Sequence, residues 1–264
     1  MANRHARLAS ELAALGPFFA VERHDPGDPP VAPWRTMADL TGSGSALRDR
    51  VTRVRTALAA VARREPMAVD PRVAVSVAHL GVVARLIAPA VGGAALGHLT
   101  VPMTVDPLWW QDELGGPFPL SVALVGRGSE PDEPGGVRLT GSAVESITLA
   151  CRRTFRMSGR VLWGNVASAA NSAATLIGGS RPDLVAAARA AADAILSDDR
   201  VDDGQLRAGP GFRRRSCCLI YRLAGTGATS AGASAAAVCG DCVLGDPART
   251  AGRRRTPADP PPTQ

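Results

Sequence analysis

The segment DPRVAVSVAHLGVVARLI, residues 70–87, decides the fold that we expect for this chain. Asp70 before Pro71 is typical of a helix N-cap followed by proline at the first helical position. The helix should run to about Ile87, because Pro89 lacks a backbone donor and breaks a helix interior. Since its residues are apolar on nearly every face, we expect this helix to lie at the centre of the protein.

The rest of the chain predicts further helices around this one. Apolar residues spaced three and four apart indicate an amphipathic helix over 47–61. Helical character returns from about residue 142, and serine or capping-box signals predict two more helices over 158–177 and 184–196. The body of the protein should therefore be built mainly from helices.

The sequence between these helical regions has a different pattern. Short apolar runs at 100–105 and 120–125 are separated by proline and glycine, which predicts a small antiparallel sheet. We therefore expect an α+β, predominantly helical fold. The helical body should span residues 1–200, a cysteine-rich segment 201–246, and a disordered tail rich in arginine and proline 247–264.

Composition and charge narrow the class of protein. The formal net charge is +6, and all 30 basic residues are arginine. Basic runs such as 63–64, 152–153 and 213–215 are short and lack interleaved aromatic residues, so we interpret most of them as solvated faces and expect no nucleic-acid partner. Glu11 interrupts the N-terminal apolar stretch, and the apolar region 73–99 is broken by polar, proline and glycine residues. We expect a cytoplasmic protein without stable membrane insertion.

Four of the five cysteines lie close together near the C-terminus: Cys217, Cys218, Cys239 and Cys242. Disulfides are disfavoured in a reducing compartment, and adjacent cysteines lie too close for an unstrained bond. Thiolate-rich sites select zinc or iron–sulfur clusters. The adjacent pair is less natural for a zinc ribbon, but spacing alone leaves both kinds of site open.

The sequence around these cysteines resembles a known family. RRSCCLIYRL (residues 214–223) followed by VCGDCVL (238–244) is similar to the C-terminal signature of the FhuF-like ferric-siderophore reductases. SGRVLWGNVA (158–167) resembles the family's Leu-Trp-Gly-Asn segment, and 73–86 resembles its early apolar helix. The interval between the two cysteine pairs is longer than the family usually has, and its glycine, alanine and serine residues (224–237) predict a flexible spacer.

The resemblance implies a function and a ligand set. It implies that Cys217, Cys218, Cys239 and Cys242 ligate a [2Fe–2S] cluster, which passes one electron to the iron of a ferric siderophore in the cytoplasm. No dinucleotide fingerprint or phosphate-binding loop is found in the sequence, so the electron should come from a donor protein of the ferredoxin or flavin-reductase type. The alternatives are a four-cysteine zinc protein and a generic iron–sulfur electron carrier.

Other reactive residues have simpler interpretations. Cys151 should be a small buried hydrophobic residue, and His79, on an apolar helix, a hydrogen-bonded core residue. Asn165 is a candidate for a hydrogen bond to a neighbouring segment. The arginines 213–215 either form a solvated run or place positive charge beside the cluster, and the sequence favours neither.

Overall fold

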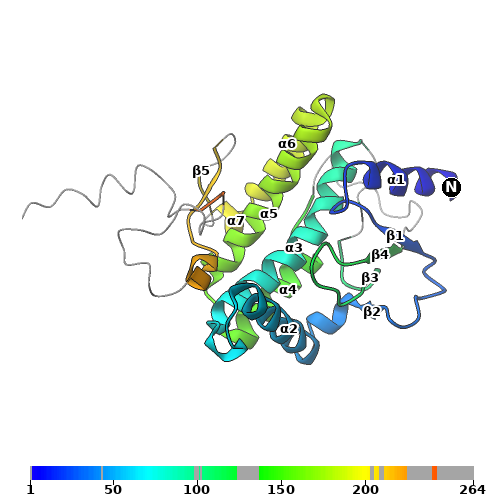
Figure 1. The fold of residues 1–264 in the computed structure, drawn as a ribbon. Coiled ribbons are helices and arrows are strands. Elements are labelled where there is room, and N and C mark those ends of the chain that lie inside the picture. Colours follow the sequence, from blue (N-terminus) through cyan, green and yellow to red (C-terminus); the bar gives the residue numbers. More distant parts are fainter. Residues whose placement is uncertain are drawn as a thin grey trace, which may run out of the picture.

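The computed structural model describes residues 2–42, 44–97, 101, 103–123, 137–202, 205–207, 211–224 and 240–242. Helices dominate this part of the chain, with a small sheet on one side and the cysteine-bearing segment on the other (Figure 1). The α+β, predominantly helical class is confirmed. The predicted spacer (224–237) and tail (247–264) lie, except for Ala224, outside the described residues.

Helix α3 (Pro71–Ala95) is the centre of the protein, as predicted. Asp70 caps it by accepting a hydrogen bond from the backbone N–H of Arg72 at 2.9 Å. Most of its residues are buried, and helices α1, α2, α4, α5 and α6 all contact it. The predicted end before Pro89 is wrong, because the helix continues through this buried proline to Ala95. Packing on all sides holds the helix together across the one lost hydrogen bond.

The predicted flanking helices are present with small changes of boundary. Ser142 caps α4 by accepting a hydrogen bond from the backbone N–H of Glu145 at 3.2 Å. Ser158 occupies the N-cap position of α5 but makes no capping hydrogen bond. The α-helices besides α3 are α1 (Ala2–Ala14), α2 (Ser45–Ala62), α4 (Ala143–Phe155), α5 (Gly159–Ser180), α6 (Val185–Leu196) and α7 (Asp199–Asp202). Short 3-10 helices are η1 (Met37–Leu40), η2 (Pro66–Ala68), η3 (Pro182–Leu184) and η4 (Ile220–Ala224).

The sheet is mixed, where the sequence predicted an antiparallel one. Its strands are β1 (Glu22–His24), β2 (Arg35–Thr36), β3 (Leu108–Trp110) and β4 (Leu120–Ala123), in the order β1-β4-β3-β2. Strand β1 runs parallel to β4, and the other two pairs are antiparallel. The predicted strand over 100–105 is wrong for its described residues, which belong to no strand.

Arg85 joins the central helix to the sheet region. This buried side chain donates to the backbone carbonyls of Phe118 at 2.7 Å and Phe18 at 3.0 Å, and also to that of Ala20. Burial lowers the pKa of Arg85 to about 10, so the guanidinium stays charged at neutral pH. The charged side chain of Arg85 therefore connects helix α3 to the segments beside the sheet.

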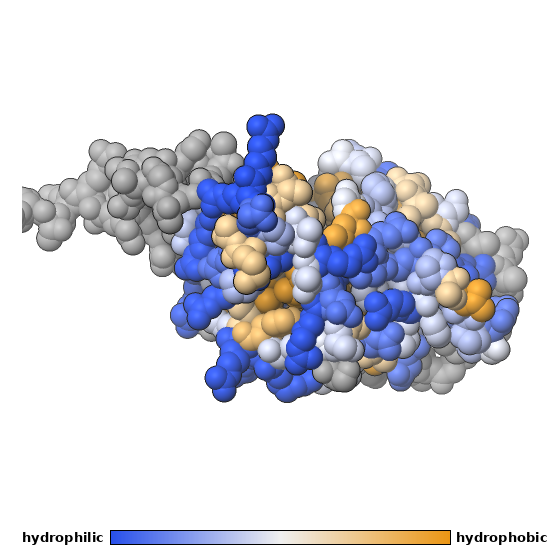
Figure 2. All heavy atoms as spheres, turned by 60° about the horizontal axis from the view of Figure 1, so that its bottom comes forward, coloured by the Kyte–Doolittle hydropathy of each residue, from blue (hydrophilic) through white to orange (hydrophobic). Residues whose placement is uncertain are grey.

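Helix α3 is long and apolar enough to cross a membrane by length and composition. However, 78% of its most apolar stretch is buried inside the protein, as expected for a core helix. The face drawn in Figure 2 is largely hydrophilic, with apolar side chains in small groups. The described residues thus resemble a water-soluble protein whose most apolar helix is covered by its neighbours.

Candidate metal centre

The cysteine-bearing segment runs along helix α5, on the side away from the four-stranded sheet (Figure 1). Strands β5 (Gln205–Arg207) and β6 (Arg213–Arg214) form a small antiparallel pair before the first cysteines. Ser216 Oγ donates to the carbonyl of Arg160 at 2.8 Å, which fixes the segment to the first turn of α5.

The second cysteine-bearing piece lies beside the first. The backbone N–H of Arg214 donates to the carbonyl of Asp241 at 3.0 Å. Ser168 Oγ on α5 donates to Asp241 Oδ2 at 2.6 Å, which anchors this piece to the same helix. Two stretches that are distant in sequence therefore meet on one surface of α5.

Two of the predicted ligands come together in this arrangement. Cys217 Sγ lies 3.9 Å from Cys242 Sγ. A tetrahedral metal with metal–sulfur bonds of about 2.3 Å, the value for zinc, holds two thiolates about 3.8 Å apart. Cys218 and Cys242 are buried and Cys217 is half-buried. The separation fits two ligands of one tetrahedral metal ion, in a zinc site or in a cluster.

The full ligand set extends beyond the described residues. Cys239 lies outside them, and within them no three His, Cys, Asp or Glu side chains surround a common metal position. The assignment of Cys217, Cys218, Cys239 and Cys242 as the ligand set therefore stays a prediction. Among its described members, Cys217 and Cys242 lie close together, and Cys218 is buried.

The protonation of Cys217 also fits a metal centre. The pKa of Cys217 is raised, first by its hydrogen bond with Cys218 and then by burial, with further contributions from the neighbouring sulfurs. A metal ion that binds the sulfur of Cys217 must therefore displace its proton. Without metal, Cys217 is a thiol at neutral pH.

The backbone supports one of the sulfurs directly. The N–H of Leu219 donates to Cys217 Sγ at 3.3 Å. Such a hydrogen bond stabilises negative charge on sulfur and is one of the features that set the reduction potential of a cluster.

A buried polar network links this segment to the protein core. Arg214 Nη2 donates to Asn165 Oδ1, and Asn165 Nδ2 donates to the Ser76 carbonyl at 3.0 Å and to His79 Nδ1 at 3.2 Å. His79 Nε2 lies 3.0 Å from Thr148 Oγ1, whose own proton goes to the Val144 carbonyl. His79 Nε2 must therefore carry the ring proton, with Nδ1 as acceptor.

This network tests three of the sequence interpretations. His79 is a hydrogen-bonded core residue, and burial first, then the charge of Arg214, lowers its pKa to about 3. Asn165 does bond a neighbouring segment, as predicted. The interpretation of 213–215 as a solvated run is wrong for Arg214, whose side chain is fully buried, although Arg215 is exposed.

Cys151 is the remaining described cysteine. It is fully buried in α4, and burial raises the pKa of its thiol to about 12. It is therefore a neutral, apolar side chain, as the sequence predicted.

Two hollows flank the cysteine-bearing segment. One, which we call the α5–α6 groove, has a volume of about 410 Å³. It is lined by Asn171, Ala174, Thr175, Gly178, Val185, Arg189, Gly211, Phe212, Arg213 and Asp241. The other, of about 310 Å³, lies by Leu219 and includes Arg72, Arg156 and Arg222. Neither hollow can be read from the sequence, because each combines residues from distant parts of the chain.

The α5–α6 groove is rich in hydrogen-bond donors. Arg189 Nη1 donates to Asn171 Oδ1 at 3.0 Å, and Arg189 Nε lies 3.4 Å from Asp193 Oδ1. Arg189 Nη2 and Arg213 Nε are buried without a hydrogen-bond partner among the described residues. The groove also contains Asp241, the residue before Cys242. A ligand here would meet unsatisfied donors next to the cysteine-bearing segment.

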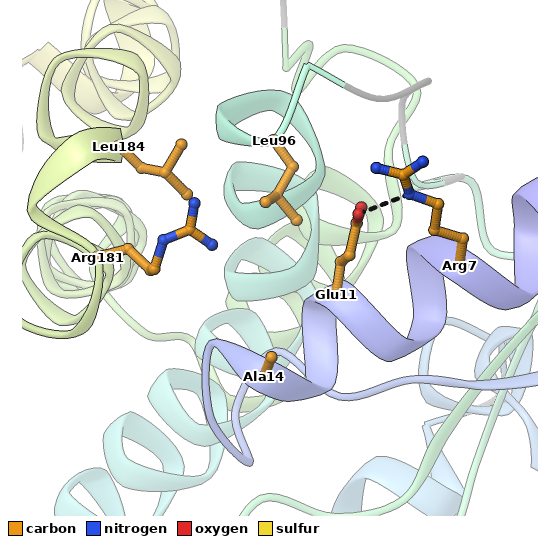
Figure 3. A pocket seen from close by; sticks show the side chains of 6 residues that line it. All are labelled: Arg7, Glu11, Ala14, Leu96, Arg181 and Leu184. Atoms are coloured by element: carbon orange, nitrogen blue, oxygen red, sulfur yellow. Dashed lines mark hydrogen bonds and ion pairs between the residues drawn. The ribbon is translucent and has the colours of Figure 1, made fainter.

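A third hollow lies away from the cysteines, between α1, the end of α3 and η3. Figure 3 shows Arg7, Glu11, Ala14, Leu96, Arg181 and Leu184 around it. Arg7 and Glu11 pair across 2.8 Å, and Arg181 pairs with Asp183. Its arginines already have carboxylate partners, whereas no described carboxylate pairs with Arg213 in the α5–α6 groove.

The fold and site define a helical protein with a thiolate-rich C-terminal segment. Residues 214–228 match the family model for the FhuF 2Fe-2S C-terminal domain. No curated protein and no solved structure matches the chain. The match confirms the family resemblance over this short segment, which contains Cys217 and Cys218. The description of the domain also confirms the [2Fe–2S] cluster as the expected cofactor.

Proposed function

We propose that this protein releases iron in the cytoplasm by reducing ferric siderophores, with one electron passing from a [2Fe–2S] cluster held by Cys217, Cys218, Cys239 and Cys242. The observation that carries the proposal is the 3.9 Å approach of Cys217 Sγ and Cys242 Sγ next to the α5–α6 groove. The family match over 214–228 supports a redox cluster over structural zinc.

The chemistry needs a one-electron donor and a place for the substrate. The cluster, when bound, supplies a single electron. A ferric siderophore holds Fe(III) with hard oxygen donors, and the softer Fe(II) ion formed by reduction binds these oxygens less strongly and can leave. The net change is one electron gained by iron and one lost by the protein.

The α5–α6 groove is the proposed binding place for the ferric complex. A siderophore surrounds its iron with oxygens that accept hydrogen bonds, and Arg189 and Arg213 offer donors that the described residues leave unsatisfied. Hydrogen bonds from a charged guanidinium to oxygen are stronger than those between neutral groups. These two arginines would hold the complex, while Asp241 and Cys242 bring the cysteine-bearing segment to its side.

The electron enters from a separate protein in this proposal, of the ferredoxin or flavin-reductase type. The hollow near Leu219 includes exposed Arg72 and Arg156 and lies on the other flank of the segment. Positive charge there would favour an acidic donor. Donor and substrate would then approach the cluster from different sides.

Metal analysis and a reduction assay test this function. Protein purified without oxygen should be coloured, contain iron and inorganic sulfide, and be bleached by dithionite. A colourless protein with one equivalent of zinc would establish the zinc alternative. A reducible cluster that transfers electrons equally to ferric siderophores and unrelated acceptors would establish the generic carrier.

A further inference from the structure

Arg214 is a buried cation that the described protein does not neutralise. Its side chain is fully buried, and among the described residues only the neutral amide of Asn165 bonds it, at Nη2. Arg214 Nε and Nη1 are buried without a partner, and no described carboxylate forms an ion pair with this guanidinium. A buried charge without a counter-charge is strongly unfavourable, so its presence requires an explanation.

The described groups around Arg214 do not neutralise its charge. Asn165 is uncharged, and His79, the next residue of the network, is neutral at physiological pH because burial and the charge of Arg214 itself lower its pKa to about 3. The carboxylate of Asp241 accepts a hydrogen bond from Ser168 and forms no ion pair with the Arg214 guanidinium. The network orients the guanidinium but leaves its charge in place.

The backbone position of Arg214 brings this residue close to the predicted cluster ligands. Its backbone N–H bonds the carbonyl of Asp241, the residue before Cys242. It also precedes Cys217 by three residues, which at about 3.8 Å per residue limits the separation of the two Cα atoms to roughly 11 Å. Two ferric ions, two sulfides and four thiolates add up to a dianion, and reduction makes it a trianion.

We propose that the Arg214 guanidinium is the buried counter-charge of the cluster, which favours its reduced form and raises its reduction potential. Asn165 is the positioning residue that fixes the guanidinium against α5. The inference rests on the proposed cluster site, and it adds a role for a residue that binds neither metal nor substrate. Charges act over longer distances in a poorly polarisable interior than in water, so a fully buried cation is more effective than an exposed one.

Three variants of the full-length protein separate charge from structure. Arg214→Gln removes the cation, Arg214→Lys keeps it, and Arg215→Gln removes the exposed neighbouring charge as a matched control. The midpoint potential is measured by optical redox titration, with iron and sulfide content determined on the same samples. Arg214→Gln should disfavour reduction at least tenfold, a fall of about 59 mV for one electron. Arg214→Lys and Arg215→Gln should shift the potential clearly less.

Other results of these measurements also support or overturn the proposed role of Arg214. If Arg214→Gln fails to load a cluster while Arg214→Lys loads one with a potential near that of the wild type, the cation is required and the inference holds. Equal potentials in Arg214→Gln and Arg215→Gln would overturn it, as would equal loss of cluster from both Arg214 variants, which assigns a structural role to the guanidinium. A wild-type protein without a cluster would instead refute the proposed function itself.

Discussion

Asn165 on helix α5 accepts a hydrogen bond from the buried side chain of Arg214, three residues before the first cysteine of the C-terminal segment. The same amide donates to the Ser76 carbonyl and to His79 on helix α3. One asparagine therefore joins the central helix to the cysteine-bearing segment. The stability of the body and the geometry of the metal centre should depend on each other through this contact.

Replacing this asparagine tests the link. Asn165→Ala should lower the free energy of unfolding by about 3 kcal/mol, because it removes the partner of a buried guanidinium and leaves other buried polar groups unpaired. Asn171→Ala is the matched control, since it lies on the same helix and accepts from the partly exposed Arg189. It should cost about 1 kcal/mol or less. Equal losses in urea unfolding would show that Asn165 has no special role.

The depressed pKa of His79 predicts a dependence of stability on pH. His79 has a pKa of about 3 in the folded protein and an ordinary value of 6.5. Between these values the unfolded chain binds a proton that the folded protein does not, so stability falls as the pH is lowered from about 6.5 toward 3. At about pH 4.5, the shifted pKa of His79 should lower the free energy of unfolding by roughly 2 to 3 kcal/mol relative to about pH 7.

The variant His79→Gln isolates this contribution, because other acidic groups titrate alike in both proteins. Urea unfolding of the wild type and the variant should show a smaller acid loss in the variant. The same loss in both proteins would mean that His79 is accessible to protons when folded.

The cysteines divide into two groups with different expected results. Serine at position Cys217, Cys218, Cys239 or Cys242 should abolish or greatly reduce the expected two iron and two sulfide, about one cluster per chain. Cys151→Ala should leave both contents unchanged, because Cys151 is buried in α4 as a neutral thiol. Loss of iron from the Cys151 variant, with retention in one of the other four, would show that the ligand set is misassigned.

The arginines of two hollows provide a matched test of substrate binding. Arg189→Gln should weaken binding of a gallium(III) hydroxamate siderophore about tenfold or more, since it removes charged donors from the α5–α6 groove. Gallium(III) resembles ferric iron but is not reduced, so calorimetry measures binding alone. Arg181→Gln, in the hollow of Figure 3, should leave the affinity unchanged, because this hollow lies away from the cysteine-bearing segment. Equal effects would exclude the groove as the binding place.

The main helices follow from sequence periodicity, and the exceptions have physical causes. Apolar spacing locates α2, α3, α5 and α6 because each has one or more faces buried against neighbours. Pro89 predicts a helix end, but tertiary packing overrides a local signal when the whole segment is buried. Strand β1 has only three residues, too few to carry an alternating pattern, so its parallel pairing with β4 could not be predicted.

The metal centre can be predicted from the sequence only where its residues form a local motif. Adjacent cysteines and a later Cys-x-x-Cys indicate a metal centre directly from the sequence. The burial of Arg214 is not predictable, since it sits between Arg213 and Arg215 and local sequence does not tell which of three arginines points inward. The α5–α6 groove combines α5, α6 and the C-terminal segment, so it arises only from tertiary packing.

The most direct test of the account is anaerobic mixing of the dithionite-reduced, desalted protein with a ferric hydroxamate siderophore and a ferrous chelator. The visible spectrum of the protein and the absorbance of the ferrous chelate are followed together. The protein should be reoxidised while the chelator captures one ferrous ion for each cluster oxidised. An intact, reducible cluster that yields no ferrous chelate with hydroxamate, catecholate or carboxylate siderophores would contradict it.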